Sequence, residues 1–377
     1  MRGAGSGQES DATRQQASAV ALEKVYLRPI AFTYGEAARA AVAAGWALPL
    51  GDPEVAFAGC EIWTRRQGEC AREVVAAAAI RAALAGRGDQ VAARGGTLLE
   101  RLIAPPAWPD ALPRETPLVM GVLNVTPDSF SDGGRFLDPE RAIAHGLELW
   151  RQGAAIVAVG GVSTRPGAEL LPAADEIARV LPVVEALAAA GVRVSIDTRK
   201  AGVMAAALAA GATMINDISA LRHDPDALAV AARSNVPVVL MHMRGEPATM
   251  QKAPAYAHPA LDVFDHLEER VAACLAAGIS RDRLIVDPGI GFGKTVEHTL
   301  QILRHLGLYR SLGVAVMLGV SRKSFIARVA DDEPVEARLP GSLAAGLVGV
   351  GNGALILRVH DVAATQQALR VWRRLLI

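Results

Sequence analysis

Polar and ionisable side chains recur directly after short apolar runs in the part of this sequence that follows residue 117. Carboxylates and an amide follow three of these runs, at Asp197, Asn216 and Asp287. A carboxylate accepts two parallel N–H bonds, and an amide offers one donor and one acceptor. These groups suit a planar heterocycle with an amino-pyrimidinone edge, and Lys323 adds a cation that can bond a ring nitrogen or carbonyl.

A second set of polar groups indicates an anionic ligand. Asn124 follows the first apolar run, and Arg358 and His360 follow the last. An amide, a guanidinium and an imidazole in one corner suit a phosphate group. The sequence has no HExxH motif and no Cys/His cluster, so a protein-bound zinc is not supported. A Mg²⁺ that arrives with a diphosphate is consistent, because Mg²⁺ favours phosphate oxygens and few protein ligands.

The elements that must position these residues follow one rhythm. Eight apolar runs alternate with amphipathic helical patterns over about 260 residues, and they lie at 118–124, 155–163, 192–197, 213–218, 237–242, 284–290, 314–321 and 353–360. Continuous apolar strands between helices predict a parallel sheet covered on its faces. The fold class is therefore α/β, and the number and length of the units predict a (β/α)₈ TIM barrel. A doubly wound open sheet is the alternative, but its GxGxxG fingerprint after the first strand is absent.

The barrel brings the polar groups together. Active sites of this fold lie at the carboxyl ends of the strands, so all eight polar strand ends share one rim. Strand eight lies beside strand one in a closed barrel, which predicts that Asn124, Arg358 and His360 converge. Any one of these residues could be a helix cap, a turn residue or a structural ion pair. Their recurrence at every strand end favours an active site.

Composition excludes several other classes of function. The chain has 377 residues and a formal net charge of zero, with 39 basic and 39 acidic residues and no basic tract, which argues against nucleic acid as a partner. Three cysteines without a CxxC pair are typical of reduced thiols in a cytoplasmic protein. The Ala-rich runs are too short and too charged to cross a bilayer. We therefore expect an intracellular protein with small-molecule partners.

The sequence before the barrel divides into three parts. Residues 1–22 are polar and are predicted to be disordered. Residues 23–104 mix apolar runs with an Ala-rich helical stretch and form an N-terminal extension of α/β type whose role the sequence does not define. Residues 105–117 carry five prolines and are predicted to be a linker, which separates the extension from a barrel at 118–377.

Residues from about 117 to 377 resemble dihydropteroate synthase of folate biosynthesis. The resemblance rests on nine segments in family order: MGVLNVTPDSFSDGG, GGVSTRPGA, VSIDT, INDIS, LMHMRGEPATMQ, IVDPGIGFGKT, GVSRKSFI, GSLAAG and RVHDV. It implies a (β/α)₈ barrel, usually a homodimer and a sulfonamide target. It also implies an enzyme that joins 6-hydroxymethyl-7,8-dihydropterin diphosphate to 4-aminobenzoate, giving 7,8-dihydropteroate and diphosphate.

The resemblance also implies a role for each matching residue. Asp197, Asn216, Asp287 and Lys323 would bind the pterin, and Asn124, Arg358 and His360 would bind the diphosphate and its Mg²⁺, with Asn124 as the metal ligand. Thr164, Arg165 and Ser324 would bind 4-aminobenzoate under the TPDSF and STRPG loops. The catalytic set would be Asp197, Lys323, Arg358 and His360. The implied mechanism is largely dissociative, so the residues act electrostatically and no covalent enzyme intermediate is needed.

One strand departs from the family pattern. Where the family has acids in DIIDIGGESTRPGA, this sequence has Ala155, Ala158 and Val162. Ala158 and Val162 are four residues apart, so a regular strand places both on one face, near Arg165. A pterin-binding paralogue that has lost turnover is therefore an alternative hypothesis. A methyltetrahydrofolate:corrinoid methyltransferase is a weaker alternative, because that class does not need a diphosphate corner with RVHDV.

Overall fold

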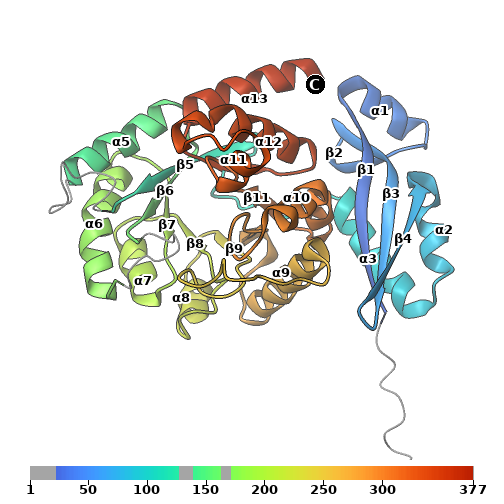
Figure 1. Cartoon of the computed structure of the whole chain (residues 1–377), viewed down its shortest axis with the longest axis horizontal. Helices are drawn as coiled ribbons and strands as arrows, with labels where there is room; N and C mark the ends of the chain where they lie inside the picture. The colour runs from blue at the N-terminus through green and yellow to red at the C-terminus, as the bar shows by residue number, and fades with distance from the viewer. Residues whose placement is uncertain (1–22, 127–138, 163–170, 377) are drawn as a thin grey trace, which may run out of the picture.

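The computed structural model describes residues 23–126, 139–162 and 171–376, and it contains a closed barrel with a separate N-terminal unit packed against it (Figure 1). The disorder expected for residues 1–22 lies outside the described residues. None of the helices within these ranges is long and apolar enough to cross a membrane.

The predicted (β/α)₈ barrel is confirmed. Its eight strands pair in parallel and in chain order, and strand β12 closes the barrel against β5, with Arg358 opposite Met120. The strands are β5 (Leu118–Asn124), β6 (Ile156–Gly160), β7 (Val194–Asp197), β8 (Met214–Asp217), β9 (Val238–Met241), β10 (Leu284–Asp287), β11 (Ala315–Leu318) and β12 (Ile356–Val359). Each carries buried residues on both faces, as expected of parallel strands under helices.

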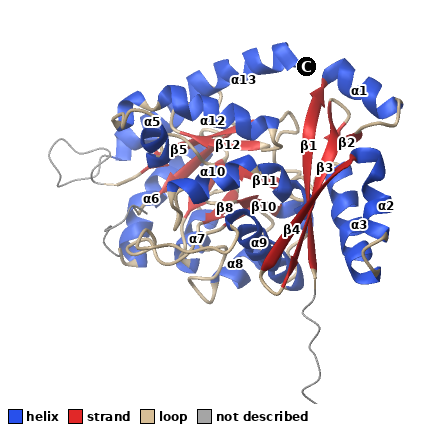
Figure 2. Cartoon of the chain, turned by 45° about the vertical axis from the view of Figure 1, so that its right-hand side comes forward, coloured by secondary structure: helices blue, strands red, loops and turns tan. Residues whose placement is uncertain are grey.

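Helices cover the outside of this barrel (Figure 2). They are α5 (Pro139–Arg151), α6 (Ala173–Ala189), α7 (Ala201–Ala209), α8 (Ala227–Arg233), α9 (Pro259–Ala276), α10 (Val296–Arg304), α11 (Ser324–Val329), α12 (Leu339–Gly351) and α13 (Val362–Leu376). Short 3₁₀ helices join them, η2 (Arg281–Arg283), η3 (Leu306–Leu312) and η4 (Val335–Ala337).

The N-terminal unit is an antiparallel sheet with three helices. Strand β1 (Lys24–Tyr34) pairs along one edge of β3 (Val55–Arg66), while β2 (Leu48–Asp52) and β4 (Glu69–Ala76) share the other edge. Helices α1 (Gly35–Ala43), α2 (Ile80–Ala85) and α3 (Asp89–Ile103), with the 3₁₀ turn η1 (Ala77–Ala79), complete the unit. Figure 2 shows its long strands standing beside the barrel.

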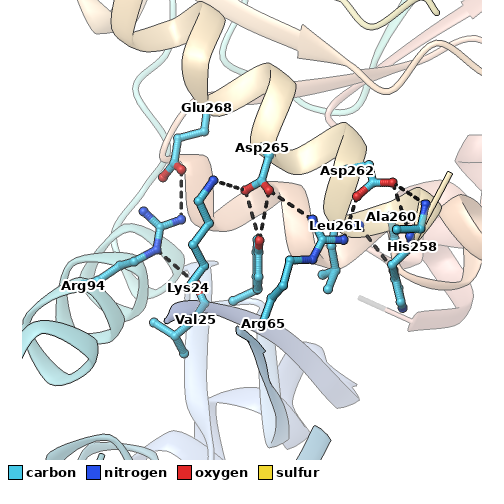
Figure 3. Close-up of polar contacts among 12 residues, drawn as sticks. Lys24, Val25, Arg65, Arg94, His258, Ala260, Leu261, Asp262, Asp265 and Glu268 are labelled. Atoms are coloured by element: carbon cyan, nitrogen blue, oxygen red, sulfur yellow. Dashed lines mark hydrogen bonds and ion pairs between the residues drawn. The ribbon is translucent and has the colours of Figure 1, made fainter. Parts of the chain in front are cut away.

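A row of acids on the barrel helix α9 receives basic and hydroxyl groups of this unit (Figure 3). Both carboxylate oxygens of Asp265 accept from the Tyr26 hydroxyl at 3.1 Å. Lys24 and Arg65 approach the same carboxylate at 3.1 and 3.2 Å. Two further pairs extend the row, Arg65 with Asp262 at 2.6 Å and Arg94 with Glu268 at 2.9 Å.

Apolar contact accompanies these charges. The Tyr26 ring is fully buried and packs edge-on against Phe264 of α9, with 5.4 Å between ring centroids. Partly exposed ion pairs contribute little each, so most of the docking energy comes from such buried area. The same burial, with Asp265 nearby, raises the pKa of Tyr26 well above its ordinary value. The N-terminal unit is therefore docked on α9, and its β1 and α3 also contact η3 of the barrel.

The proline-rich segment 105–117 closes the base of the barrel. Ala107 forms an isolated parallel bridge with Val314, just ahead of β11. Trp108 and Leu112 belong to the apolar cluster inside the barrel, with Met120 and Ile156 among its members. Parallel barrels need side chains to fill their interior, and this segment supplies two of them. We infer that residues 105–117 are a plug as well as a connection.

The plug makes a prediction about stability. Trp108 is only 9 % exposed, so Trp108→Ala should lower the free energy of unfolding by about 3 kcal/mol, because a large buried ring leaves a cavity. Trp150 on α5 is 44 % exposed, and Trp150→Ala is the matched control, expected to change stability by less than about 1 kcal/mol. Denaturant unfolding of both variants measures the difference. Equal losses would contradict the plug.

Candidate active site

A cavity of about 540 Å³ lies at the carboxyl ends of the barrel strands. Each of the eight strands, or the residue directly after it, contributes to the lining. The predicted site residues that the structure describes all line this cavity: Asn124, Asp197, Asn216, Asp287, Lys323, Ser324, Arg358 and His360. Thr164 and Arg165 lie outside the described residues, as do Pro127 and the residues that follow it in the TPDSF loop.

Two acidic and two basic side chains, of which Asp287 is buried and the others are partly buried, lie at the floor of the cavity. Arg358 Nη2 donates to Asp197 Oδ2 at 2.6 Å across the barrel mouth. The second pair, Asp287 and Lys323, lies near Gly319 without a direct salt bridge in the described structure, and a Cβ added to Gly319 would lie 3.9 Å from both Asp287 Oδ2 and Lys323 Nζ. Buried charges persist only when they are paired or hydrogen-bonded, so this cluster is an interdependent set.

Burial shifts the proton affinity of the second pair. It raises the pKa of Asp287 above the ordinary value, while Lys323 and the Gly289 N–H oppose that shift. It lowers the pKa of Lys323 to about 8, and Asp287 opposes this shift. Lys323 Nζ also donates to the Ile290 carbonyl and lies 4.9 Å from the centroid of the Phe292 ring. A proton can therefore be held or released here near neutral pH.

The loop after β10 is shaped by two glycines. Gly289 has φ +65°, and a Cβ there would lie 2.0 Å from the His242 carbonyl oxygen. Gly293 has φ +62° and would place a Cβ 2.2 Å from the Arg244 carbonyl oxygen. Only glycine permits this backbone path. The path brings Ile290 and Phe292 to the cavity wall.

A buried lysine outside the cavity holds the same loop. Lys294 Nζ donates to the carbonyls of Gly289 and Phe292 at 2.8 and 3.0 Å, and it lies 2.8 Å from His242 Nδ1. Burial lowers the pKa of Lys294 well below its ordinary value. His242 follows β9 as predicted for a strand end, but its ring serves this support and does not line the cavity.

His360 is held as a neutral donor. Its backbone N–H donates to Ser321 Oγ at 3.1 Å, and its Nδ1 lies 3.0 Å from the same oxygen. The Ser321 hydroxyl proton is then free to bond Nδ1, which leaves the proton of the neutral ring on Nε2. Burial, with Arg358 and Arg322 nearby, lowers the pKa of His360 to about 4. A neutral imidazole can donate one hydrogen bond to an anion without adding a full charge.

Two buried side-chain polar atoms of the residues that line the cavity have no hydrogen-bond partner in the described ranges. They are Asn216 Oδ1 and Arg358 Nε, and the Asn216 side chain is buried. Buried polar atoms are nearly always paired, so an unpaired acceptor and donor beside a cavity indicate ligand contacts. The acceptor, Asn216 Oδ1, belongs to the residues predicted to bind the heterocycle. The donor, Arg358 Nε, belongs to those predicted to bind the anion.

Two arginines of the lining were not assigned a role from the sequence. Arg322 has φ +57° and is held by a Ser342 hydroxyl 2.8 Å from its N–H and by an ion pair with Asp361. Arg338 donates to the Arg322 carbonyl at 3.2 Å. The positive φ of Arg322 is a strained conformation of the kind found at functional sites. The one local sequence signal that Arg322 lies at the cavity is its position directly before Lys323 in the segment GVSRKSFI.

Asp217, the other acid at the end of β8, has a structural role. Its carboxylate is fully buried and accepts from Ser219 N, Ser219 Oγ and Leu221 N at 2.7 to 2.9 Å. Three donors stabilise the ionised form, although burial raises the pKa of Asp217. Asp217 thus fixes the turn after β8, while its neighbour Asn216 faces the cavity.

The altered strand β6 has an apolar interior. Ala158 is fully buried in the inner cluster of the barrel, Ala155 packs against that cluster, and Val162 lines the cavity. Ala158 lies opposite Ser195 on β7, whose buried Oγ has no hydrogen-bond partner among the residues described. The interior is therefore apolar except for one hydroxyl beside the position of the missing acid.

Metal ligands of the usual kind are not clustered in the described ranges. They contain no group of three His, Cys, Asp or Glu side chains that could hold a metal ion. Asn124, the predicted metal ligand, lies exposed at the end of β5 on the cavity wall. An amide oxygen there can supply one hard ligand to a cation that phosphate oxygens also hold.

The low pKa of Lys323 predicts how stability depends on pH. The unfolded chain keeps this proton up to about pH 10.5, whereas the folded chain releases it near pH 8, so raising the pH between these values favours folding. Relative to Lys323→Met, the wild-type free energy of unfolding should rise by on the order of 2 kcal/mol over this range. Denaturant titrations at several pH values measure it. The exposed Lys252→Met is the control, and a flat difference for Lys323→Met would contradict the assignment.

Known proteins match both the sequence and this architecture. A family profile described as pterin binding enzyme matches residues 120–360. Dihydropteroate synthase of Haemophilus influenzae is 46 % identical over 258 residues, which cover 68 % of this chain and 93 % of the relative. The Escherichia coli K12 enzyme of the same name is 45 % identical over 256 residues, covering 68 % and 90 %.

Solved structures agree with these sequence relatives. Xanthomonas albilineans dihydropteroate synthase with 4-aminobenzoic acid aligns with TM-score 0.66 and 50 % identity, covering 69 % of this chain and 93 % of that one. The same enzyme in complex with 7,8-dihydropteroate aligns with TM-score 0.64 and 47 % identity, covering 70 % and 95 %. The chain belongs to the dihydropteroate synthase family of pterin-binding enzymes.

Proposed function

We propose that this protein is a transferase that condenses 6-hydroxymethyl-7,8-dihydropterin diphosphate with 4-aminobenzoate to give 7,8-dihydropteroate and diphosphate. The observation that carries the proposal is the cavity at the barrel mouth, where the Asp197–Arg358 ion pair and the charges of Asp287 and Lys323 lie with an unpaired amide oxygen and an unpaired guanidinium N–H. The Xanthomonas albilineans relatives bound to 4-aminobenzoic acid and to 7,8-dihydropteroate support it.

The pterin part of the cavity is assigned to four residues. Asp197 and Asp287 accept from the amino and ring N–H groups, Asn216 adds an acceptor and a donor, and Lys323 donates to a ring nitrogen or carbonyl. Both carboxylates also lie where positive charge develops on the ring as the leaving group departs. Lys323 lies 4.9 Å from the centroid of the Phe292 ring, which places an aromatic surface beside the pterin floor.

The reaction transfers the pterin, through its exocyclic methylene carbon, from a diphosphate oxygen to an amine nitrogen. The amine nitrogen of 4-aminobenzoate forms a bond to the exocyclic methylene of the pterin as the bond from that carbon to the diphosphate oxygen breaks. The electron pair of the broken bond leaves on diphosphate, and the proton that the amine then loses passes to the departing diphosphate or to water. Arg358, through its unpaired Nε–H, and His360, through Nε2–H, stabilise that leaving charge.

A bound Mg²⁺ would supply further positive charge to the diphosphate. Its site fits the residues present, because Asn124 offers a single amide oxygen and Mg²⁺ takes most of its ligands from phosphate and water. The 4-aminobenzoate is assigned to Ser324 on the cavity wall, together with Thr164 and Arg165. Sulfonamides would compete there, as the Yersinia pestis relative solved with a sulfonamide drug complex suggests.

A paralogue with impaired turnover is the second candidate. The specific observation in its favour is Ala158, beside which Ser195 Oγ is buried without a partner in the described part of the chain. Such an orphan is what loss of a neighbouring acid leaves behind. Against it, every predicted substrate-binding residue within the described ranges lines the cavity.

Assembly and location complete the proposal. We propose a homodimer, supported by exposed apolar side chains on α12 and α13, of which Val348 is 58 %, Val371 56 % and Leu375 78 % exposed. Sedimentation of the whole chain tests it. Free thiols at Cys60, Cys70 and Cys274 support a reducing compartment such as the cytoplasm.

Removing one floor carboxylate tests the activity. Asp197→Asn should lower kcat/KM by roughly a hundredfold or more, because charge-assisted bonds of about 1.5–3 kcal/mol each are lost and Arg358 loses its partner. Asp265→Asn is a matched control, since its side chain is 21 % exposed against 14 % for Asp197 but it lies on α9. A diphosphate-release assay and thermal midpoints are the measurements. Near-normal kcat/KM in Asp197→Asn would sink the assignment.

The altered strand tests the alternative. Ala158→Asp should lower the free energy of unfolding by about 3 kcal/mol or more, because one Ser195 hydroxyl cannot satisfy a buried carboxylate. Val162→Glu, at the cavity wall, should be milder, and Ala158→Ser is the conservative control. Thermal midpoints and diphosphate release are measured on each single variant and on the double variant that combines Ala158→Asp with Val162→Glu. A double variant with higher turnover and unchanged stability would favour the impaired paralogue.

A further inference from the structure

A second cavity lies at the opposite end of the barrel, between the N-terminal unit, the plug and the barrel itself. Its volume is about 230 Å³. The N-terminal unit contributes residues 50–52 and Val55, the plug contributes Trp108, and the barrel contributes Arg310, Leu355 and Trp372. None of the residues at the barrel mouth lines it, so this cavity is separate from the candidate active site.

Arg310 is a buried cation without a carboxylate partner in this cavity. It lies in η3, its side chain is 2 % exposed, and its Nε and Nη1 have no hydrogen-bond partner among residues 23–126, 139–162 and 171–376. Its Nη2 reaches the Leu50 carbonyl oxygen only at 3.5 Å. Unpaired buried guanidinium groups are costly, so an anion that pairs with Arg310 would be strongly favoured.

Two glycines hold the side chain in place. Gly353 of the barrel has φ +96°, and a Cβ there would lie 2.8 Å from Arg310 Cγ. Gly51 of the N-terminal unit has φ +68°, and a Cβ there would lie 2.8 Å from Arg310 Nη2. The Arg310 side chain thus passes close to the backbones of Gly353 and Gly51, which fix the orientation of its guanidinium group. A planar fork held in this way is prepared for a bidentate acid group.

The other charges of the cavity leave Arg310 available. Arg373 pairs with Glu115 at 3.4 Å and Arg114 pairs with Asp110 at 2.8 Å, and both of these acids are 86 % exposed. Asp52 is the acid in the lining, and its Oδ1 accepts from the Glu54 backbone N–H at 2.8 Å. Burial lowers the pKa of Arg310 to about 10, Asp52 opposes the shift, and the group remains charged at neutral pH.

The rest of the wall is flat and apolar. Trp108 and Trp372 line it with Leu355, Val350 and Pro106. The indole Nε1–H of Trp108 is buried and also has no hydrogen-bond partner in the described part of the chain. An apolar cavity of roughly 150 Å³ holds one benzene ring, so the volume here accommodates a single ring with its acid group.

We propose that this cavity binds a small planar organic carboxylate, with the acid group on Arg310 and the ring between the tryptophans and the plug. The ligand would touch the N-terminal unit, the plug and the barrel together. It would bind the docked arrangement better than any state in which the N-terminal unit has moved away. Binding should therefore stabilise the docking of the extension.

Benzoate is the probe that tests this proposal. Calorimetry on the whole chain should give benzoate binding that Arg310→Gln weakens at least tenfold. Arg165→Gln is the control, because it changes the arginine that we propose binds 4-aminobenzoate and should leave benzoate binding at the base cavity unchanged. That control also separates the proposal from the proposed activity, since benzoate bound in the 4-aminobenzoate position would be weakened in Arg165→Gln and kept in Arg310→Gln.

A second variant guards against a folding defect in Arg310→Gln. Val55→Phe fills the cavity from the N-terminal unit without touching the cation, and it should also weaken benzoate binding at least tenfold at an unchanged thermal midpoint. Benzoate should raise the thermal midpoint of the wild type but not of Val55→Phe. Absence of millimolar benzoate binding to Arg165→Gln, or benzoate binding that both Arg310→Gln and Val55→Phe leave intact, would overturn the proposal. Inorganic phosphate that binds there as tightly as benzoate would overturn the ligand class.

Discussion

The removal of four charges from bulk water, in part or in full, at the barrel mouth constrains the rest of the structure. Asp197 and Arg358 form an ion pair, and Asp287 and Lys323 are oppositely charged groups that both lie near Gly319. A charge taken from water needs a partner close by, or it neutralises. The partners come from β7, β12, β10 and the segment after β11, so only a closed barrel brings them together. The chemistry and the closure of the fold thus depend on each other.

Not every polar atom of this cluster has a hydrogen-bond partner in the described structure, which leaves atoms for the ligand that we propose. Arg358 gives one arm to Asp197, while its Nε stays unpaired in the described structure. Asn216 Oδ1 is also unpaired, whereas both carboxylate oxygens of its neighbour Asp217 accept hydrogen bonds from the chain. Structural polar groups here are saturated by the chain, and the groups at the cavity keep one position for a ligand. Lys294 belongs to the first kind, because carbonyls of the β10 loop surround it.

The barrel and the polar rim could be predicted because both signals are local. Buried parallel strands are continuous apolar runs, and a polar residue at the end of each run is visible in the sequence. It is harder to predict which of two adjacent polar residues faces the cavity. At the end of β8, Asn216 lines the cavity, whereas Asp217 binds Ser219 in the turn. His242 shows the same limit, since its partner Lys294 lies 52 residues further along.

The docking of the extension could not be predicted, because its determinants are paired across the chain. An acidic row at helical spacing looks the same whether it faces water or a basic partner, and Asp265 meets Tyr26 across 239 residues. Composition predicts a linker for the proline-rich segment and says nothing about where Trp108 points. The role of that segment in filling the barrel depends on the space that β5 to β12 leave at their base.

Each end of the barrel has a guanidinium group at a cavity, and the two groups differ in whether a carboxylate is paired with them. At the mouth, Arg358 has a carboxylate 2.6 Å away, so the site is neutralised before any ligand arrives. At the base, Arg310 is more deeply buried and has only a distant carbonyl at 3.5 Å. A ligand at the mouth must compete with Asp197 for Arg358, which favours strong anions such as a diphosphate. Within the described residues, Asp52 lines the base cavity but forms no ion pair with Arg310, so a ligand there displaces no bound carboxylate and a weak, singly charged acid suffices.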